Sequence, residues 1–368
     1  MKRILLTGGG TAGHVTPNIA LLSRLRELEF EIVYTGTRAG IEDQLITREG
    51  VPFYPISAGK LRRYLDFKNV TDLFRIAAGF FQSILLLIKL RPDIVFSKGG
   101  FVSCPVVWAA RLLRIPAVIH ESDMTPGLAN RLSLPFARRI CYSFPETAAH
   151  LPAAKAVHTG LPIREMLRSG DGAAGKRLCE FTDEKPVILI MGGSLGSVAV
   201  NGAVRAALPG LLAEFNVCHI CGRGNLAEEV EGCRQFEFVN DDLANLFAMA
   251  DVFVGRSGAT TLFELLALKK PSLLIPLGSA ASRGDQILNA ESFERQGFSA
   301  VVRQEELTAA TLTAGIKKVY TNRAIMIQAM EASSIPDGVS SVIKVIMAIL
   351  DEKKHGKINA GKVVSGAK

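Results

Sequence analysis

Short runs of branched apolar residues alternate with helix-length segments from one end of the chain to the other. The first half carries such runs at residues 4–6, 32–35, 93–97, 117–120 and 140–143, and the second half at 187–190, 217–221, 252–254 and 273–275. The runs are continuous and do not alternate with polar residues, which is typical of parallel strands buried on both faces. The pattern therefore predicts an α/β protein with parallel sheets.

The two halves of the chain begin in nearly the same way. The segment Ile4-Leu5-Leu6-Thr7-Gly8-Gly9 opens the first half, and Ile188-Leu189-Ile190-Met191-Gly192-Gly193 opens the second. Each leads through a glycine-rich turn into a helix, which predicts two similar doubly wound, Rossmann-like domains facing one another. We place them at residues 1–163 and 164–336, and we expect a last helix within residues 337–352 and a disordered polar tail over 353–368.

Charge is distributed unevenly along the 368 residues. Residues 1–164 hold 21 Lys and Arg against 12 Asp and Glu, a balance of +9, whereas residues 165–368 hold 22 against 23. A basic first half suits an anionic partner, such as nucleic acid or a membrane surface, and equally suits a basic lobe without one. The six cysteines lack the spacing of a disulfide or metal framework, and Cys218 and Cys221 read as core residues of a reduced, cytosolic protein.

One apolar segment, residues 70–89, stands beside several basic residues. Its longest uncharged run covers 13 residues, 76–88, which is shorter than the roughly 18 needed to span a bilayer. The segment fits a helix packed on the sheet, and it also fits an interfacial patch that inserts apolar side chains among lipid headgroups. The nearby cations that would meet anionic lipid are Lys60, Arg62, Arg63, Lys68 and Arg75.

The first glycine turn has the spacing of a dinucleotide-binding loop. Gly8, Gly10 and Gly13 fit that fingerprint, but the second strand ends in 34–38 without the acid that would hold a nicotinamide ribose. Further glycine turns follow strands at residues 98–101, 192–196 and 256–258, where open α/β sheets bind ligands. Glu264, early on its helix, can accept both hydroxyls of a ribose or stabilise the helix dipole.

Six motifs occur in the order in which the MurG family carries them: Gly9-Gly10-Thr11-Ala12-Gly13-His14, Gly99-Gly100-Phe101-Val102-Ser103, His120-Glu121-Ser122, Gly192-Gly193-Ser194, Arg256-Ser257-Gly258-Ala259 and Asp285-Gln286-Ile287-Leu288-Asn289-Ala290. The chain therefore resembles the MurG family of UDP-N-acetylglucosamine:undecaprenyl-diphospho-muramoylpentapeptide N-acetylglucosaminyltransferases. The resemblance implies a glycosyltransferase-B fold whose last helix crosses back to the first domain. It also implies inverting transfer of GlcNAc to the MurNAc C4 hydroxyl of lipid I, which gives β-1,4-linked lipid II for peptidoglycan.

The same resemblance supplies roles for individual residues. The implied catalytic candidates are His14, Glu121 and His120, which the sequence does not rank. The implied substrate-binding positions are Thr11, Ala12, Gly13, Asp123, Arg164, Ser194, Asn240, Ala259, Thr260, Thr261, Leu262, Phe263, Glu264 and Gln286. Glu264 would hold the ribose, Gln286 the sugar hydroxyls and Arg164 the pyrophosphate, while Lys98 and Arg256 are weaker candidates for that charge.

Two positions depart from the family pattern. The sequence His120-Glu121-Ser122-Asp123 stands where better-known members read His-Glu-Gln-Asn, and a carboxylate at position 123 cannot donate a hydrogen bond. Asn240 occupies a uracil-binding position that is often isoleucine. We expect neither metal nor cofactor, no nucleic-acid partner, and a peripheral location on the cytoplasmic side of a bacterial membrane, reached through the patch near Phe74 to Ile88.

Two other functions share parts of this pattern. A UDP-GlcNAc 2-epimerase would use the same two domains, but it would leave the apolar and basic patch without a use. A non-catalytic nucleotide-sugar or nucleic-acid-binding protein would suit the basic half, although one Trp and five Tyr offer few stacking side chains.

Overall fold

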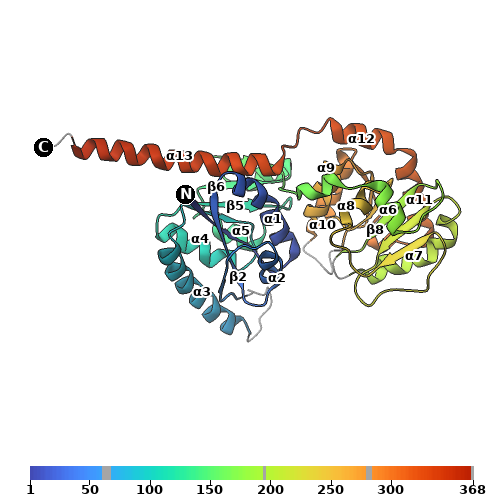
Figure 1. The fold of residues 1–368 in the computed structure, drawn as a ribbon, viewed down its shortest axis with the longest axis horizontal. Helices are drawn as coiled ribbons and strands as arrows, with labels where there is room; N and C mark the ends of the chain where they lie inside the picture. Colours follow the sequence, from blue (N-terminus) through green and yellow to red (C-terminus); the bar gives the residue numbers. More distant parts are fainter. Residues whose placement is uncertain (60–67, 194–195, 279–283, 366–368) are drawn as a thin grey trace. The chain divides into compact units, whose positions relative to one another are not determined.

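The computed structural model describes residues 1–59, 68–193, 196–278 and 284–365, with the backbone alone at 68–71 and 353–365. The chain forms two compact units (Figure 1). Unit 1 comprises Met1–Ile163 and Ile335–Lys368, and unit 2 comprises Arg164–Ser334. Each unit is built on a parallel sheet with helices on both faces.

Unit 1 contains a seven-stranded sheet in the order β3-β2-β1-β4-β5-β6-β7, with all neighbours parallel. Its strands are β1 (Lys2–Thr7), β2 (Phe30–Thr37), β3 (Phe53–Ile56), β4 (Ile94–Ser97), β5 (Ala117–Glu121), β6 (Arg139–Tyr142) and β7 (Ala156–His158). Its helices are α1 (Ala12–Glu27), α2 (Ile41–Arg48), α3 (Lys68–Leu90), α4 (Ser103–Leu112), α5 (Leu128–Ser133), the 3₁₀ helix η1 (Pro145–His150) and α13 (Gly338–Ser365).

Unit 2 repeats this plan with six parallel strands in the order β10-β9-β8-β11-β12-β13. Its strands are β8 (Val187–Met191), β9 (Asn216–Ile220), β10 (Cys233–Phe236), β11 (Val252–Gly255), β12 (Ser272–Leu274) and β13 (Ser299–Val301). Its helices are η2 (Glu165–Ser169), α6 (Gly172–Leu178), α7 (Val198–Leu211), α8 (Leu243–Met249), α9 (Ala259–Leu268), α10 (Asp285–Arg295), η3 (Gln304–Glu306), α11 (Ala309–Thr321) and α12 (Arg323–Glu331).

The sheet of unit 1 is buried on both faces, which explains its continuous apolar strands. On β1, Ile4 and Leu6 pack into one core cluster together with α1 and α13, whereas Leu5 packs into a second cluster with α3 and α4. Successive side chains of a strand point to opposite faces, so the middle residues of an inner strand are apolar in succession when helices cover both faces. The predicted parallel α/β architecture is confirmed by this arrangement.

The last helix returns to unit 1 through a close crossing of two segments. A side chain at Gly160 would meet the Pro336 carbonyl oxygen, because an ideal Cβ there lies 2.3 Å from it, and Gly160 has a φ of +68°. An ideal Cβ on Gly338 would likewise lie 2.0 Å from the carbonyl carbon of Leu161. Only glycine permits this approach. The backbones of residues 160–161 and 336–338 therefore pack directly against each other where the chain returns to unit 1.

The structure differs from the sequence prediction at the end of this helix. Helix α13 continues to Ser365 and does not end near residue 352, where the sequence predicted the start of a polar tail. No proline follows Leu350, and four of the residues 353–365 are lysine, which favours helices. The helix is long and projects past the sheet (Figure 1).

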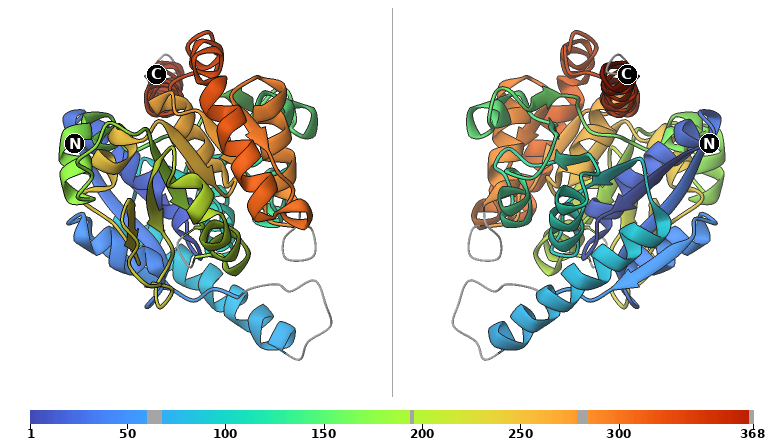
Figure 2. Two further views of the ribbon diagram at one scale, coloured as in Figure 1. Left: turned by 90° about the vertical axis from the view of Figure 1, so that its right-hand side faces the viewer. Right: turned by 90° about the vertical axis from the view of Figure 1, so that its left-hand side faces the viewer.

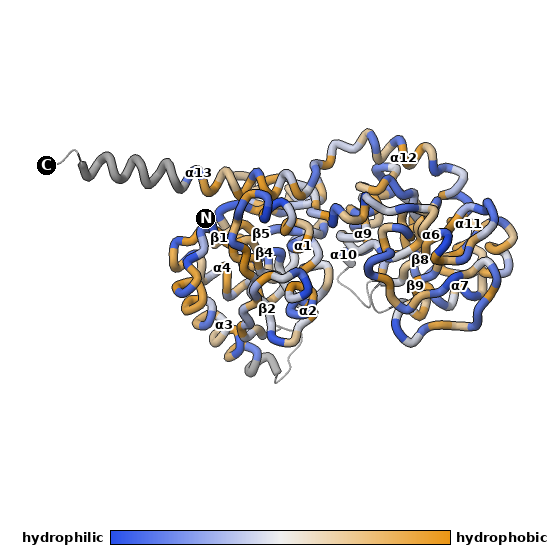
Figure 3. The backbone as a smooth tube through the Cα atoms, viewed as in Figure 1, coloured by the Kyte–Doolittle hydropathy of each residue, from blue (hydrophilic) through white to orange (hydrophobic). Residues whose placement is uncertain are grey.

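Helix α3 combines a buried and an exposed face. Leu87 and Leu90 are buried in the core of unit 1, whereas Phe74, Phe81 and Leu85 are 72%, 65% and 68% exposed. Figure 2 shows the helix along the outside of unit 1, and Figure 3 shows apolar residues recurring along it. Among the described residues, one helical segment, Asp72–Leu90, is long and apolar enough to cross a membrane on length and composition alone.

The packing of α13 gives a stability prediction. Ile346 is fully buried in the core of unit 1, so Ile346→Ala should lower the free energy of unfolding by about 2–5 kcal/mol. The control is Ile325→Ala on α12, because Ile325 is 66% exposed and its truncation should change little. Urea denaturation measures the free energy of unfolding of both variants. If Ile346→Ala lowered it as little as Ile325→Ala does, α13 would not be part of the core.

Candidate functional site

Three loops of unit 1 meet at the carboxyl edge of its sheet, after β1, β4 and β5. The Lys98 amide donates to the Thr7 carbonyl at 2.9 Å, which joins the first two loops. A Cβ on Gly100 would lie 2.3 Å from the Gly9 carbonyl oxygen, so glycine lets these loops touch. A Cβ on Gly99 would lie 3.6 Å from the His14 ring and about as close to Asn130. The loops therefore form one packed surface around His14.

Buried polar side chains hold the first glycine loop in place. Asn18 donates to the Thr7 carbonyl at 3.2 Å, and the Tyr34 hydroxyl donates to the Gly8 carbonyl at 2.8 Å. Burial raises the pKa of Tyr34, so its hydroxyl stays protonated as a donor. The carboxylate of Glu42, fully buried on α2, accepts from the Gly10 amide at 3.1 Å. The Gly10 amide is therefore already occupied, unlike the open amides of a dinucleotide-binding loop.

His14 lies in the first turn of α1, which Thr11 caps and Ala12 and Gly13 begin. Its Nδ1 is 3.0 Å from the Thr11 hydroxyl, and its ring is partly exposed. These four predicted residues therefore lie together at the start of one helix, where backbone amides point towards the edge of the sheet.

Glu121 is buried at the end of β5 and is fully engaged by hydrogen bonds. Its carboxylate accepts from the amides of Ser122, Asp123 and Gly127 at 2.9, 3.1 and 2.9 Å, and from the Asn130 side chain at 2.8 Å. Burial raises the pKa of Glu121, and these hydrogen bonds oppose that rise. The carboxylate thus organises the loop after β5, including Asp123, and offers no open oxygen for proton transfer.

His120 is equally enclosed. Lys98 Nζ lies 3.0 Å from its Nδ1, and its Nε2 lies 2.9 Å from the Gly160 carbonyl. Since an ammonium can only donate, Nδ1 is the acceptor and Nε2 carries the proton. Burial and the charge of Lys98 hold the pKa of His120 well below its usual range. Of the three predicted catalytic candidates, only His14 combines titratable chemistry with exposure at this edge.

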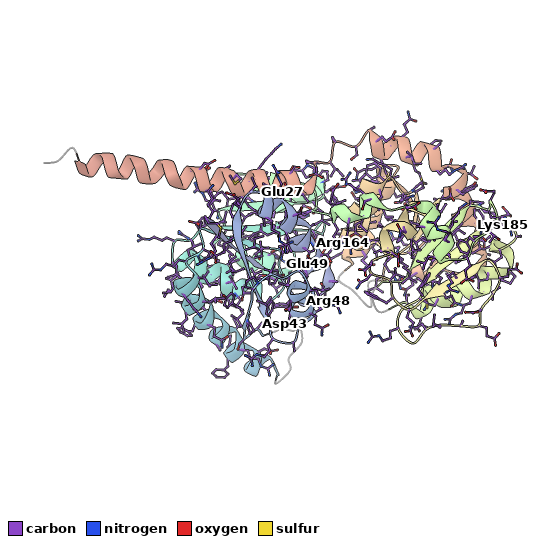
Figure 4. All side chains as sticks on the ribbon, viewed as in Figure 1. Glu27, Asp43, Arg48, Glu49, Arg164 and Lys185 are labelled. Atoms are coloured by element: carbon purple, nitrogen blue, oxygen red, sulfur yellow. The ribbon has the colours of Figure 1, made fainter. Side chains whose placement is uncertain are left out.

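In unit 2, the predicted ribose and pyrophosphate residues pair with one another. Arg164, labelled in Figure 4 at the start of unit 2, donates to Glu264 Oε1 at 3.1 Å. Burial raises the pKa of Glu264, and Arg164 opposes this. The other carboxylate oxygen has no partner in the part of the chain that the structure describes.

The remaining predicted positions of unit 2 cluster around α9 and α10. Gly258 caps α9, so the amides of Ala259, Thr260 and Thr261 are available to an anion, while the side chains of Leu262 and Phe263 are buried and only pack. Gln286 accepts from the Leu277 amide at 3.0 Å, which leaves its amide group as a donor.

Two predicted positions contribute less. The Asn240 carbonyl accepts from the Leu243 amide at 3.2 Å, and its side chain is exposed. Ser194 lies outside the described residues.

The side chain of Arg256 joins several loops of unit 2 by hydrogen bonds. Its guanidinium donates to the Ser197 hydroxyl and the Gln304 side chain at 2.7 Å each, and to the Ile275 carbonyl at 3.0 Å. With these partners it fixes the loops after β8 and β12. All six cysteines are buried and unpaired, and no group of three potential metal ligands occurs among the described residues.

Sequence reasoning missed Glu42, Asn18 and Asn130, and it gave Lys98 too little weight. Glu42 and Asn130 lie on helices and carry no motif, since what matters is the loop that they reach in the fold. Lys98 did offer a signal, because only Ser97 separates this lysine from the apolar run Ile94-Val95-Phe96, so its side chain begins at a buried position. Its burial is nearly complete, with 1% of the residue exposed.

Two parallel-sheet Rossmann-like units with helix N-termini and glycine turns at the ends of their strands give the chain a glycosyltransferase-B fold. The chain belongs to glycosyltransferase family 28. The N-terminal domain model of that family matches residues 4–142, and its C-terminal domain model matches residues 187–346. The expected relation to the MurG family is confirmed.

Relatives from several bacteria are similar over nearly their whole length. A UDP-N-acetylglucosamine--N-acetylmuramyl-(pentapeptide) pyrophosphoryl-undecaprenol N-acetylglucosamine transferase of Clostridium botulinum is 51% identical over 94% of this chain and 99% of its own. The protein of the same name from Geobacillus thermodenitrificans is 52% identical over 94% and 98%.

Solved structures agree with this relation. Acinetobacter baumannii MurG is 26% identical, with a TM-score of 0.75 over 95% of this chain and 100% of its own. A putative UDP-N-acetylglucosamine 2-epimerase of Listeria monocytogenes, 14% identical with a TM-score of 0.69 over 96% and 98%, shares the fold.

Proposed function

We propose that this protein transfers N-acetylglucosamine from UDP-N-acetylglucosamine to the MurNAc C4 hydroxyl of undecaprenyl-diphospho-MurNAc-pentapeptide (lipid I), with inversion at the anomeric carbon. The observation that carries the proposal is half identity, over nearly full length, to relatives named for this donor and acceptor. Both units also hold side chains suited to such a transfer. The product is lipid II, a precursor of peptidoglycan.

His14 is the proposed general base. It would take the proton of the acceptor hydroxyl while that oxygen bonds to the anomeric carbon and the bond to UDP breaks. Histidine is the side chain that ordinarily changes charge near neutral pH. Glu121 and His120 act as positioning residues, because hydrogen bonds occupy the carboxylate and both ring nitrogens.

Unit 2 is the proposed binding unit for the donor. The second oxygen of Glu264 would accept from ribose hydroxyls, and the side-chain amide of Gln286 would donate to sugar hydroxyls. Arg164 and the first amides of α9 would stabilise the charge that develops on the leaving diphosphate. Thr11 to Gly13 and Asp123 would contact the substrates from unit 1, and Ser194 and Asn240 from unit 2.

Membrane contact through α3 is the proposed route to the lipid acceptor. Leu73, Phe74, Phe81, Leu85 and Ile88 are exposed by 52% or more and recur along one helix. A groove of about 620 Å³ in the same unit is lined by five cations and by Glu352, which pairs with two of them, Arg138 and Arg139. The remaining cations, Arg111, Arg114 and Lys155, leave the groove positively charged, which suits an anionic lipid surface. Because the other face of α3 packs into the core, we propose peripheral binding on the cytoplasmic side.

The function is tested with purified protein, UDP-[¹⁴C]GlcNAc and a lipid I analogue. We expect UDP release and labelled lipid when the analogue is present, and little UDP release without it. Formation of the 2-epimer of the sugar nucleotide without acceptor would instead support an epimerase. Binding of UDP-GlcNAc without either reaction would contradict any catalytic role.

Two substitutions should separate donor binding from proton transfer. Glu264→Gln keeps an acceptor for Arg164 but removes the carboxylate, so the KM for UDP-GlcNAc should rise about 10- to 100-fold. His14→Ala should lower kcat about 10²- to 10⁴-fold with little change in that KM. Steady-state kinetics measures both. An unchanged donor KM in the first variant, or an unchanged kcat in the second, would refute the corresponding role.

Membrane binding is tested by replacing exposed residues of α3. Phe74→Ser, Phe81→Ser and Leu85→Ser combined should weaken pelleting with anionic liposomes and spare turnover of a soluble acceptor, because these side chains lie outside the core. Phe80 and Ile84 are left intact, since both pack against the core.

A matched triple variant in unit 2 serves as the control. Leu226→Ser, Val230→Ser and Ile325→Ser also remove exposed apolar side chains and should leave liposome binding unchanged. An equal loss of binding in both triple variants would contradict a specific role of α3.

A further inference from the structure

The loop after β5 contains a hydrogen-bonded pair that the roles above leave unused. The ammonium of Lys98, at the end of β4, donates to the Ser122 hydroxyl and lies 3.0 Å from His120 Nδ1. Lys98 is 1% exposed, whereas Ser122 is partly exposed. The pair thus connects a buried cation to a side chain that solvent or a substrate can reach.

The direction of this hydrogen bond fixes what Ser122 can do. An ammonium has no lone pair, so the Ser122 oxygen must be the acceptor and its own proton must point elsewhere. No acceptor for that proton occurs within the described parts of the chain. A hydroxyl held in this way is a donor directed away from Lys98, at the same sheet edge as His14.

We propose that Ser122, oriented by Lys98, donates a hydrogen bond to an acceptor-only oxygen of a substrate, namely a phosphate or amide carbonyl oxygen. Such oxygens match a hydroxyl whose proton is directed away from Lys98. Ser122 also supplies a hydrogen-bond donor in the loop where Asp123 replaces the asparagine of the family pattern, since a carboxylate cannot donate. The inference rests on the proposed transfer and deepens it. Ser122 would contact the substrate, and Lys98 would be a positioning residue.

The charges around Lys98 make the arrangement dependent on pH. Burial lowers the pKa of Lys98 to about 8, although Glu121 and Asp123 oppose this shift. The other groups that face Lys98 are His120 on β5 and Cys141 on β6, and burial raises the pKa of the Cys141 thiol to about 12. Below pH 8 the ammonium holds Ser122 as a donor. Above pH 8 the neutral amine can accept the Ser122 proton, so the hydroxyl is no longer directed to the substrate.

The test measures kcat/KM for UDP-GlcNAc and for the lipid I analogue between pH 6 and 9.5. We expect wild-type kcat/KM to decline near pH 8. Ser122→Ala should lower kcat/KM about tenfold at pH 7 and remove this decline. Ser122→Thr, which keeps the hydroxyl, should restore most of both. The substrate whose KM rises in Ser122→Ala, donor or acceptor, is the one that carries the contacted oxygen.

Lys98→Met tests the positioning role. It should reproduce the loss and the flat alkaline profile. Adding Ser122→Ala to Lys98→Met should cause no further loss, because the Ser122 hydroxyl is already released in the single Lys98 variant. The control is Lys270→Met, since Lys270 is a lysine of unit 2 that donates to the carbonyls of Ala248 and Ala250. It should retain the decline near pH 8.

The outcomes separate this inference from the proposed function. Absence of transfer by wild-type protein would refute the function itself. Transfer by wild type with an unchanged rate and pH profile in Ser122→Ala would refute only the role of Ser122. Failure of Lys98→Met to fold would leave Ser122→Ala and Ser122→Thr to decide.

Discussion

The buried carboxylate of Glu121 is the constraint on which the edge of unit 1 depends. An ionised carboxylate inside a protein is tolerated only when hydrogen bonds or charges replace its water, and here four donors do so. Three of them are backbone amides of the loop after β5, so the loop must wrap around the carboxylate. Asn130, the fourth donor, ties α5 to the same point. The position of Ser122 and Asp123 is a consequence of this wrapping.

Lys98 balances this negative charge from the neighbouring strand. Its side chain is buried beneath the loop, where it keeps His120 neutral and in a single tautomer. Glu121 and His120 are therefore both engaged in holding the loop after β5. This agrees with the proposed base in the first glycine turn.

Unit 2 has the same architecture as unit 1 but presents different groups at the edge of its sheet. Its sheet edge presents helix amides at α9 and a paired Arg164 and Glu264, whereas Arg256 is consumed in bracing the loops. Amides and a paired arginine can stabilise a diphosphate without a metal ion. The first glycine turn of unit 1, in contrast, has its Gly10 amide occupied by Glu42. The similar sequences at residues 4–9 and 188–193 are therefore followed by sheet edges that carry different hydrogen-bonding groups.

The sequence by itself determined the inner strands, the two-unit plan and the family, because these depend on continuous apolar runs and on motifs that are local in the chain. It missed β3, β7, β10 and β13, which are the four edge strands. An edge strand pairs on one side only and is short here, so it needs no long apolar run. Tertiary structure alone decided which of His14, His120 and Glu121 is partly exposed and which are buried. That outcome depends on burial and on partners such as Lys98 and Asn130, which the fold brings from other elements and no local pattern records.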